Sequence, residues 1–131
     1  MTEASGKVET YPAELGTIDR DALMRCIEDL EQCTRACGNC GDICTSEVKD
    51  QYPGLCVDLP EVCTTTKRIL TGEAGRNVDV SRAMLEACAA MCRATADECE
   101  LTAAEREHCR RCAEASRRCE RSCRELAASL G

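Results

Sequence analysis

Hydrophobic residues and cysteines recur along this sequence in alternating steps of three and four residues. Such steps place side chains on one stripe of an α-helix, the seam through which the helices of a bundle pack together. Four segments carry the pattern, running from Leu23 to Cys44, from Tyr52 to Leu70, from Leu85 to Cys99 and from Glu105 to Leu130. The sequence therefore predicts an all-α fold built from four amphipathic helices.

Turn-forming residues separate the four segments. Residues 49–54 include a Pro-Gly pair and residues 71–77 include two glycines, and both stretches are typical of turns. Asp79 or Ser81 can cap the third helix, and residues 102–105 (TAAE) predict a capping box that opens the fourth. Connections this short favour an up-down-up-down four-helix bundle.

Two local features conflict with this pattern. Gly38 and Gly41 weaken the first helix by about 1 kcal/mol each relative to alanine. The alternative for residues 37–41 (CGNCG) is a cysteine loop of a zinc or iron–sulfur site, but the steps of three and four pass through it unbroken. Pro60 stands inside the second segment, so that helix is expected to kink or to begin there.

All 14 cysteines fall on the four seams. The chain has no Phe, no Trp and only two Tyr, and cysteine packs as a small hydrophobic residue when it is buried. We therefore expect the thiols to form much of the core. The set consists of Cys26, Cys33, Cys37, Cys40, Cys44, Cys56, Cys63, Cys88, Cys92, Cys99, Cys109, Cys112, Cys119 and Cys123.

Composition limits the cellular compartment and the classes of partner that we expect for this protein. A net charge of −7 and the scarcity of aromatic residues argue against a nucleic-acid partner. No apolar stretch approaches the roughly 20 residues of a membrane span, and residues 1–9 lack the pattern of a signal peptide. We expect a cytoplasmic protein, where thiols stay reduced, with a flexible N-terminal tail over 1–18 and the bundle domain over 19–131.

Dense thiols in a reducing compartment point to metal binding. Cysteines three or four positions apart on a helix have Cβ atoms about 5–6 Å apart, which suits an ion that bridges adjacent turns. Thiolates select soft copper(I), whereas zinc takes closed sets of four ligands and commonly includes histidine. Continuous strips of cysteine with one histidine therefore predict multiple Cu(I) ions per chain, with every cysteine listed above as a ligand.

The predicted helix directions give the two ends of the bundle different characters. Leucines gather at one end, and Cys44, Cys56, Cys99 and Cys109 gather at the other. We expect this second end to be the mouth, with His108 and Asp58 helping metal to enter. The alternative for His108 is an exposed histidine at a helix start. Met84 and Met91 are candidate soft ligands, although packing explains them better.

Two other classes of protein fit part of the pattern. One is a disulfide-stapled helical scaffold, and the other is a zinc or iron–sulfur binding protein. The number of free thiols under reducing conditions separates the first from a copper protein, and metal preference separates the second. An enzyme is not expected, because the chain has one histidine, no nucleophile–base pair and no phosphate loop.

Several of these motifs resemble the bacterial copper storage proteins, in the branch without a signal peptide. The resemblance covers residues 20–127 and is strongest at 87–92 (ACAAMC), 107–115 (EHCRRCAEA) and 119–124 (CERSCR), together with the cysteine run from 33 to 44. It implies a cysteine-lined four-helix bundle that stores many Cu(I) ions in the cytosol and assembles as a homotetramer.

The sequence departs from that family at five positions. Leu59, Thr95 and Ser116 stand where the resemblance implies cysteines, and Thr102 and Ala104 stand where it implies histidines of the mouth. The departures predict a smaller copper capacity and an entrance with fewer histidines.

Overall fold

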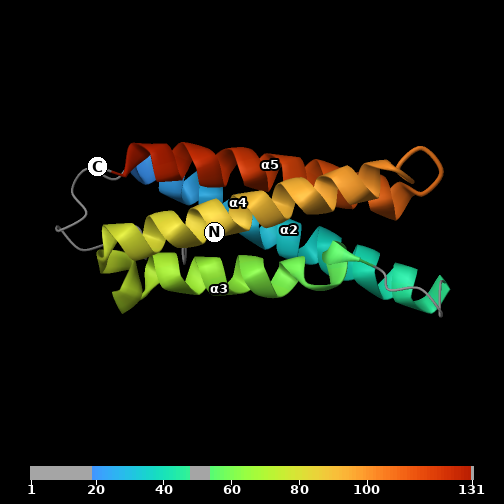
Figure 1. The fold of residues 1–131 in the computed structure, drawn as a ribbon, viewed down its shortest axis with the longest axis horizontal. Helices are drawn as coiled ribbons and strands as arrows, with labels where there is room; N and C mark the ends of the chain where they lie inside the picture. Colours follow the sequence, from blue (N-terminus) through green and yellow to red (C-terminus); the bar gives the residue numbers. More distant parts are fainter. Residues whose placement is uncertain (1–18, 48–53, 131) are drawn as a thin grey trace.

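The computed structural model describes residues 19–47 and 54–130, and within these ranges the chain is helical without β-strands (Figure 1). The predicted tail over 1–18 lies outside the described residues. Among the described residues there are four α-helices: α2 (Arg20–Glu47), α3 (Leu59–Thr71), α4 (Val78–Glu100) and α5 (Glu107–Ser129). Two short 3₁₀ helices, η2 (Leu55–Val57) and η3 (Glu73–Arg76), precede α3 and α4.

The four α-helices form the up-down-up-down bundle that the sequence predicts. Helices that follow one another in the chain run antiparallel, as Figure 1 shows. Helix α2 packs against α3 and α5, and α4 packs against the same two helices from the other side. Each helix therefore has two neighbours, and its seam faces the interior shared by all four.

Helix starts are set by side chains that satisfy free backbone amides. Asp19 begins α2, because its Oδ1 accepts hydrogen bonds from the amides of Asp21 (3.0 Å) and Ala22 (3.1 Å). Asn77 caps α4, with its Oδ1 accepting from the amide of Val80 at 3.1 Å. The prediction of Asp79 or Ser81 as the cap of this helix is therefore wrong, since both lie inside its first turns.

The fourth helix also begins later than predicted. Helix α5 starts at Glu107, with Arg106 at the N-cap. The predicted capping box at 102–105 belongs instead to the turn that follows α4, where Thr102 Oγ1 donates to the Cys99 carbonyl at 3.4 Å. Its threonine therefore helps to close α4 and does not open α5.

The two features that conflicted with helical periodicity have different outcomes. Helix α2 continues through Gly38 and Gly41 without a break, so the cysteine-loop alternative for residues 37–41 is wrong. Helix α3 begins at Leu59, so Pro60 occupies its first turn, where a missing amide hydrogen costs least. The alternative of a kink at Pro60, with the helix continuing back through Cys56, is wrong, because Cys56 lies on η2.

Leucines fill one end of the interior and cysteines fill most of the rest. At the end where the chain enters α2 and leaves α5, the buried leucines are Leu23, Leu70, Leu85, Leu126 and Leu130. None of the described helices is both long and apolar enough to cross a membrane.

Candidate metal centre

Every cysteine of the chain is a free thiol, and all except the half-buried Cys44 are buried inside the bundle. Most have no exposed surface, including Cys33, Cys63, Cys92 and Cys119. The structure thus places all predicted cysteines in one shared interior, as their spacing indicates.

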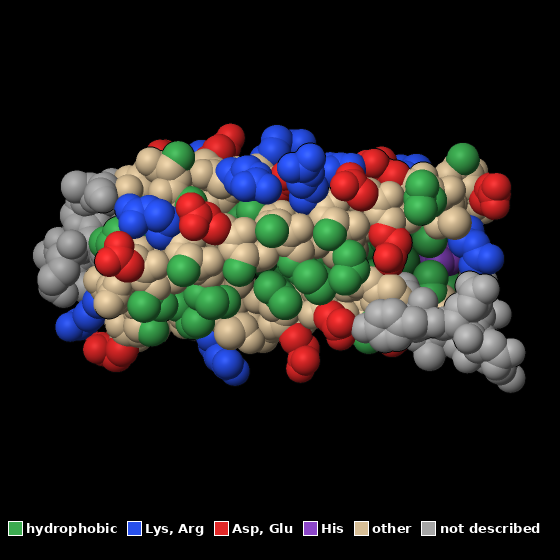
Figure 2. All heavy atoms as spheres, viewed as in Figure 1, with side chains coloured by type: hydrophobic (Ala, Val, Ile, Leu, Met, Phe, Trp, Pro, Cys, Tyr) green, Lys and Arg blue, Asp and Glu red, His purple; other side chains and the backbone are tan. Residues whose placement is uncertain are grey.

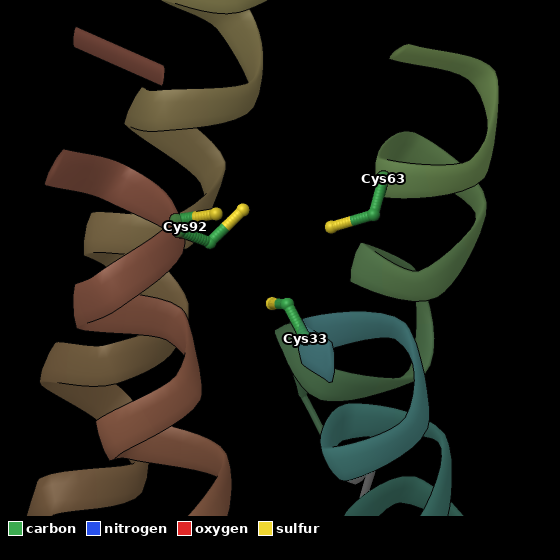
Figure 3. A group of neighbouring side chains, drawn as sticks. Cys33, Cys63 and Cys92 are labelled. Carbon is green, nitrogen blue, oxygen red and sulfur yellow. The ribbon is translucent and has the colours of Figure 1, made fainter. Parts of the chain in front are cut away.

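The central group contains one cysteine from each helix. Cys33 of α2, Cys63 of α3, Cys92 of α4 and Cys119 of α5 have sulfur atoms that all lie within 4.8 Å of one another. Figure 3 shows Cys33, Cys63 and Cys92 pointing from three different helices into the same space. Four sulfurs at this separation can hold soft metal ions between them.

Further thiols extend the central group in both directions along the bundle. Toward the leucine end, Cys88 and Cys123 join Cys119 in a group of three, and Cys26 Sγ lies 3.8 Å from Cys123 Sγ. Toward the other end, Cys37 Sγ lies 3.8 Å from Cys33 Sγ. The thiols therefore form a continuous column.

The column continues to the end opposite the leucines. Cys37 Sγ lies 2.8 Å from Cys112 Sγ. Cys112 belongs to a further group of three with Cys40 and Cys99. This group connects the middle of the bundle to the predicted mouth.

At the mouth, a histidine joins the thiols. The ligand atoms of Cys40, Cys44, His108 and Cys109 all lie within 4.8 Å of one another, and His108 Nδ1 is 3.6 Å from Cys109 Sγ. Cys44 is the most accessible cysteine. The predicted gathering of Cys44, Cys109 and His108 at one end is present in the structure.

Two further predicted residues lie near the mouth in different roles. Cys56 is buried on η2, and the neighbouring Cys40 is the main cause that raises the pKa of its thiol to about 11. Asp58 is exposed, and its backbone amide donates to the Leu55 carbonyl at 3.1 Å. Asp58 lies outside the group around His108.

The family comparison decides among the soft metals that such a site could hold. The family model of the copper storage proteins (Csp) matches residues 19–128, nearly the whole chain. The chain belongs to the copper storage protein family. A comparison with curated proteins gave no match.

Solved structures of a Streptomyces lividans copper storage protein, Ccsp, are similar to this family member. Ccsp loaded with 10 copper equivalents shares 44% identity, with a TM-score of 0.88, over 97% of this chain and 99% of Ccsp. A second structure, described as a cytosolic copper storage protein loaded with five coppers, shares 43% identity, with a TM-score of 0.78, over 85% of this chain and 96% of the other.

The positions where this family member lacks an expected cysteine are buried in the core. Leu59, Thr95 and Ser116 have no exposed surface. Ser116 Oγ lies 3.4 Å from Cys37 Sγ and 3.8 Å from Cys33 Sγ. Thr95 Oγ1 instead donates to the Met91 carbonyl at 2.8 Å. A hydroxyl therefore stands beside the thiol column at Ser116, whereas the hydroxyl of Thr95 is used within its own helix.

Burial and shared hydrogen bonds shift the acidity of the thiols. Burial raises the pKa of Cys44 and of Cys109, and a hydrogen bond with Cys123 raises the pKa of Cys119. Hydrogen bonds from Cys112 and Cys56 act the other way on Cys40 and lower its pKa to about 6. Hydrogen bonds from Cys119 also lower the pKa of Cys33 and Cys88. Raised pKa values still outnumber lowered ones, which favours the neutral form for most of the thiols.

The steps of three and four residues predicted that every cysteine of the column faces inward. They did not predict the contacts that hold the segment with Cys56. Glu98 of α4 and Gly41 of α2 contact the segment around η2. Neither residue lies on a predicted seam. The Pro-Gly pair at 53–54 indicated a turn there, but no sequence signal indicated which helices the turn contacts.

Proposed function

We propose that this chain stores copper(I) by binding many ions to the cysteine column inside the bundle. The observation that carries the proposal is the continuous series of buried free thiols contributed by all four helices. Family membership supports the same function. We propose all 14 cysteines as ligands and expect no catalytic activity.

Charge balance favours copper(I) over a divalent ion at high loading. Fourteen ionised thiolates in a low-dielectric interior would be strongly destabilised, so the metal must displace protons as it binds. About one Cu(I) per thiolate leaves the interior near neutrality. Divalent zinc at the same ratio would leave a large positive excess.

We infer that copper enters at the mouth and not at the leucine end. The mouth has the half-buried ligands Cys44 and His108, whereas buried leucines such as Leu126 close the other end. We propose His108 as a ligand that passes copper inward. Asp58 is exposed near this end of the bundle, and we limit its proposed part to attracting cations.

We also propose that the protein works in the cytosol as a homotetramer. The relative loaded with five coppers is described as cytosolic. Figure 2 shows hydrophobic side chains along α3 and α4. Independently of that view, exposed residues on α4 form a second seam, which consists of Val80, Ala83, Ala87, Ala90 and Ala94. Small residues in steps of three and four allow helices of two copies to pack closely, and light scattering is expected to give the mass of four chains.

An anaerobic titration with Cu(I) against a chromophoric chelator tests storage. We expect about ten or more tightly bound ions per chain, scaled from one soft ion per thiolate. Uptake of only two to four ions, or a preference for zinc over copper(I), would favour discrete zinc or iron–sulfur sites. A thiol count far below 14 in the reduced protein would favour the disulfide-stapled scaffold.

A further inference from the structure

One wall of the mouth is built differently from the other three. Helix α3 has 13 residues, whereas α4 and α5 each have 23. At the mouth its place is taken by residues Gly54–Asp58, called here the strap, which include η2 and carry Cys56. The strap packs against both α2 and α4. The position of Cys56 therefore depends on contacts with these two helices, because Cys56 is not part of α3.

On the α4 side, the strap is held by a carboxylate. The backbone amide of Leu55 donates to Glu98 Oε1 at 3.0 Å. Gly54 has a φ of 88° and lies so close to the Glu98 carboxylate that a Cβ there would overlap it. Only glycine adopts this backbone conformation at low cost and leaves this space.

The role of Glu98 differs from that of its acidic neighbours at the end of α4. Asp97 and Glu100 form ion pairs with Arg117 of α5, at 2.6 Å and 2.7 Å. Acidic groups near a helix C-terminus are unfavourable unless another group compensates for their charge. For Glu98, the backbone amide of the strap is a compensating group that the structure shows.

On the α2 side, the strap rests on a glycine. Gly41 is buried, and a Cβ at this position would lie 3.3 Å from the Cys56 carbonyl oxygen and 3.5 Å from Val57 Cα. A larger residue would push the strap away from α2. Gly41 thus permits the close approach that brings Cys56 to the thiols of the mouth.

We propose that Glu98, acting with Gly41, is a positioning residue that holds the strap so that Cys56 faces the thiols of the mouth. Glu98 acts through the strap backbone and is not itself a copper ligand. The consequence for copper uptake rests on the proposed storage function, whereas the positioning itself does not.

Amide hydrogen exchange of the metal-free protein tests the positioning directly. We expect Glu98→Ala to speed exchange in the peptide containing Leu55–Asp58 about tenfold, because a charge-assisted hydrogen bond is lost. Exchange over Cys63–Leu70 should stay unchanged. Glu98→Gln keeps the accepting oxygen and should restore slow exchange. The matched control Glu100→Ala removes a carboxylate from the same helix end without touching the strap. Unchanged exchange in Glu98→Ala would overturn the proposal.

Copper uptake tests whether the effect passes through Cys56. Glu98→Ala should slow the first phase of Cu(I) uptake about threefold or more, on the scale of one lost hydrogen bond, while Glu100→Ala should not. In a Cys56→Ser background, Glu98→Ala should cause no further slowing. Slowing of equal size in that background would overturn positioning through Cys56. If the chain takes up no copper at all, the proposed storage function is wrong. The hydrogen-exchange result still tests whether Glu98 holds the strap in place.

Discussion

Cysteine occupies the positions that larger hydrophobic residues hold in an ordinary helical bundle. Most of these cysteine side chains are fully buried, and the chain has no Phe or Trp to fill the interior instead. A thiol is small and weakly polar, so it packs against leucine without needing a strong hydrogen-bond partner. The same side chain can therefore fill the core of the metal-free protein and bind metal when copper arrives.

Ser116 offers a test of this double use at a single residue. Its hydroxyl lies beside Cys33 and Cys37 in the column, so a thiol there would add a ligand in a suitable place. We expect Ser116→Cys to raise the copper capacity by about one ion, in proportion to thiolates. The competitive Cu(I) titration measures the change.

Ser122→Cys is the matched control for Ser116→Cys. Ser122 is also a buried serine of α5, but its hydroxyl bonds with Asp29 of α2 and is not among the contacts of the thiol column. This variant should leave the capacity of the column unchanged. An equal gain in both variants would mean that copper binds wherever a thiol is added, without regard to the column.

At the scale of the helices, periodicity predicted which residues face inward but not where each helix begins. Steps of three and four place Cys92 and Cys119 on seams, and both are buried. The spacing from Cys56 to Leu59 fits a 3₁₀ turn as well as an α-helix, so it could not reveal η2. Helix starts depend on single hydrogen bonds, such as that of Asn77, for which several nearby residues compete.

The cap at Asn77 is testable by its contribution to stability. We expect Asn77→Ala to lower the free energy of unfolding by about 1 kcal/mol, because the amide of Val80 loses its partner. Urea denaturation of the reduced, metal-free protein measures this. Asn39→Ala removes the same side chain from an exposed position within α2 and should be neutral or slightly stabilising. An equal loss of stability in both variants would rule out Asn77 as the cap.

At the scale of the whole molecule, the helices place their sulfur atoms at matching heights in one interior. The sequence predicted a mouth and a leucine end from chain direction alone. It could not predict that Cys33, Cys63, Cys92 and Cys119 share one level, because this depends on how far each helix slides along its neighbours. That registration is set by packing and by the turns, including the strap before α3.

The raised pKa values of the thiols make the stability of the metal-free bundle sensitive to pH. Burial raises the pKa of Cys44 and Cys109, and a hydrogen bond with Cys123 raises that of Cys119. In the unfolded chain these thiols ionise at about pH 8.5. The thiols whose pKa is raised by folding therefore contribute stability below that pH. This contribution is lost as the pH rises toward their pKa values in the folded protein.

Cys40 has the opposite effect over a lower range. Its pKa of about 6 means that its contribution is lost as pH falls through about 6 and is constant above about 8.5. At alkaline pH, any change of the folding stability with pH therefore comes from the thiols whose pKa is raised and not from Cys40. We expect the urea midpoint of the metal-free protein to fall between about pH 8.5 and 10.5, and that of the copper-loaded protein to change less. A midpoint that is constant or rises for the metal-free protein would contradict these shifts.

The central claim is that copper occupies the interior shared by the four helices. Anomalous diffraction at the copper absorption edge, from crystals loaded anaerobically with Cu(I), locates the metal directly. We expect peaks between the sulfur atoms from the His108 end down to the level of Cys26 and Cys123, and none among the leucines at the other end. Copper found mainly on the outer surface, with the sulfur column empty, would contradict the claim.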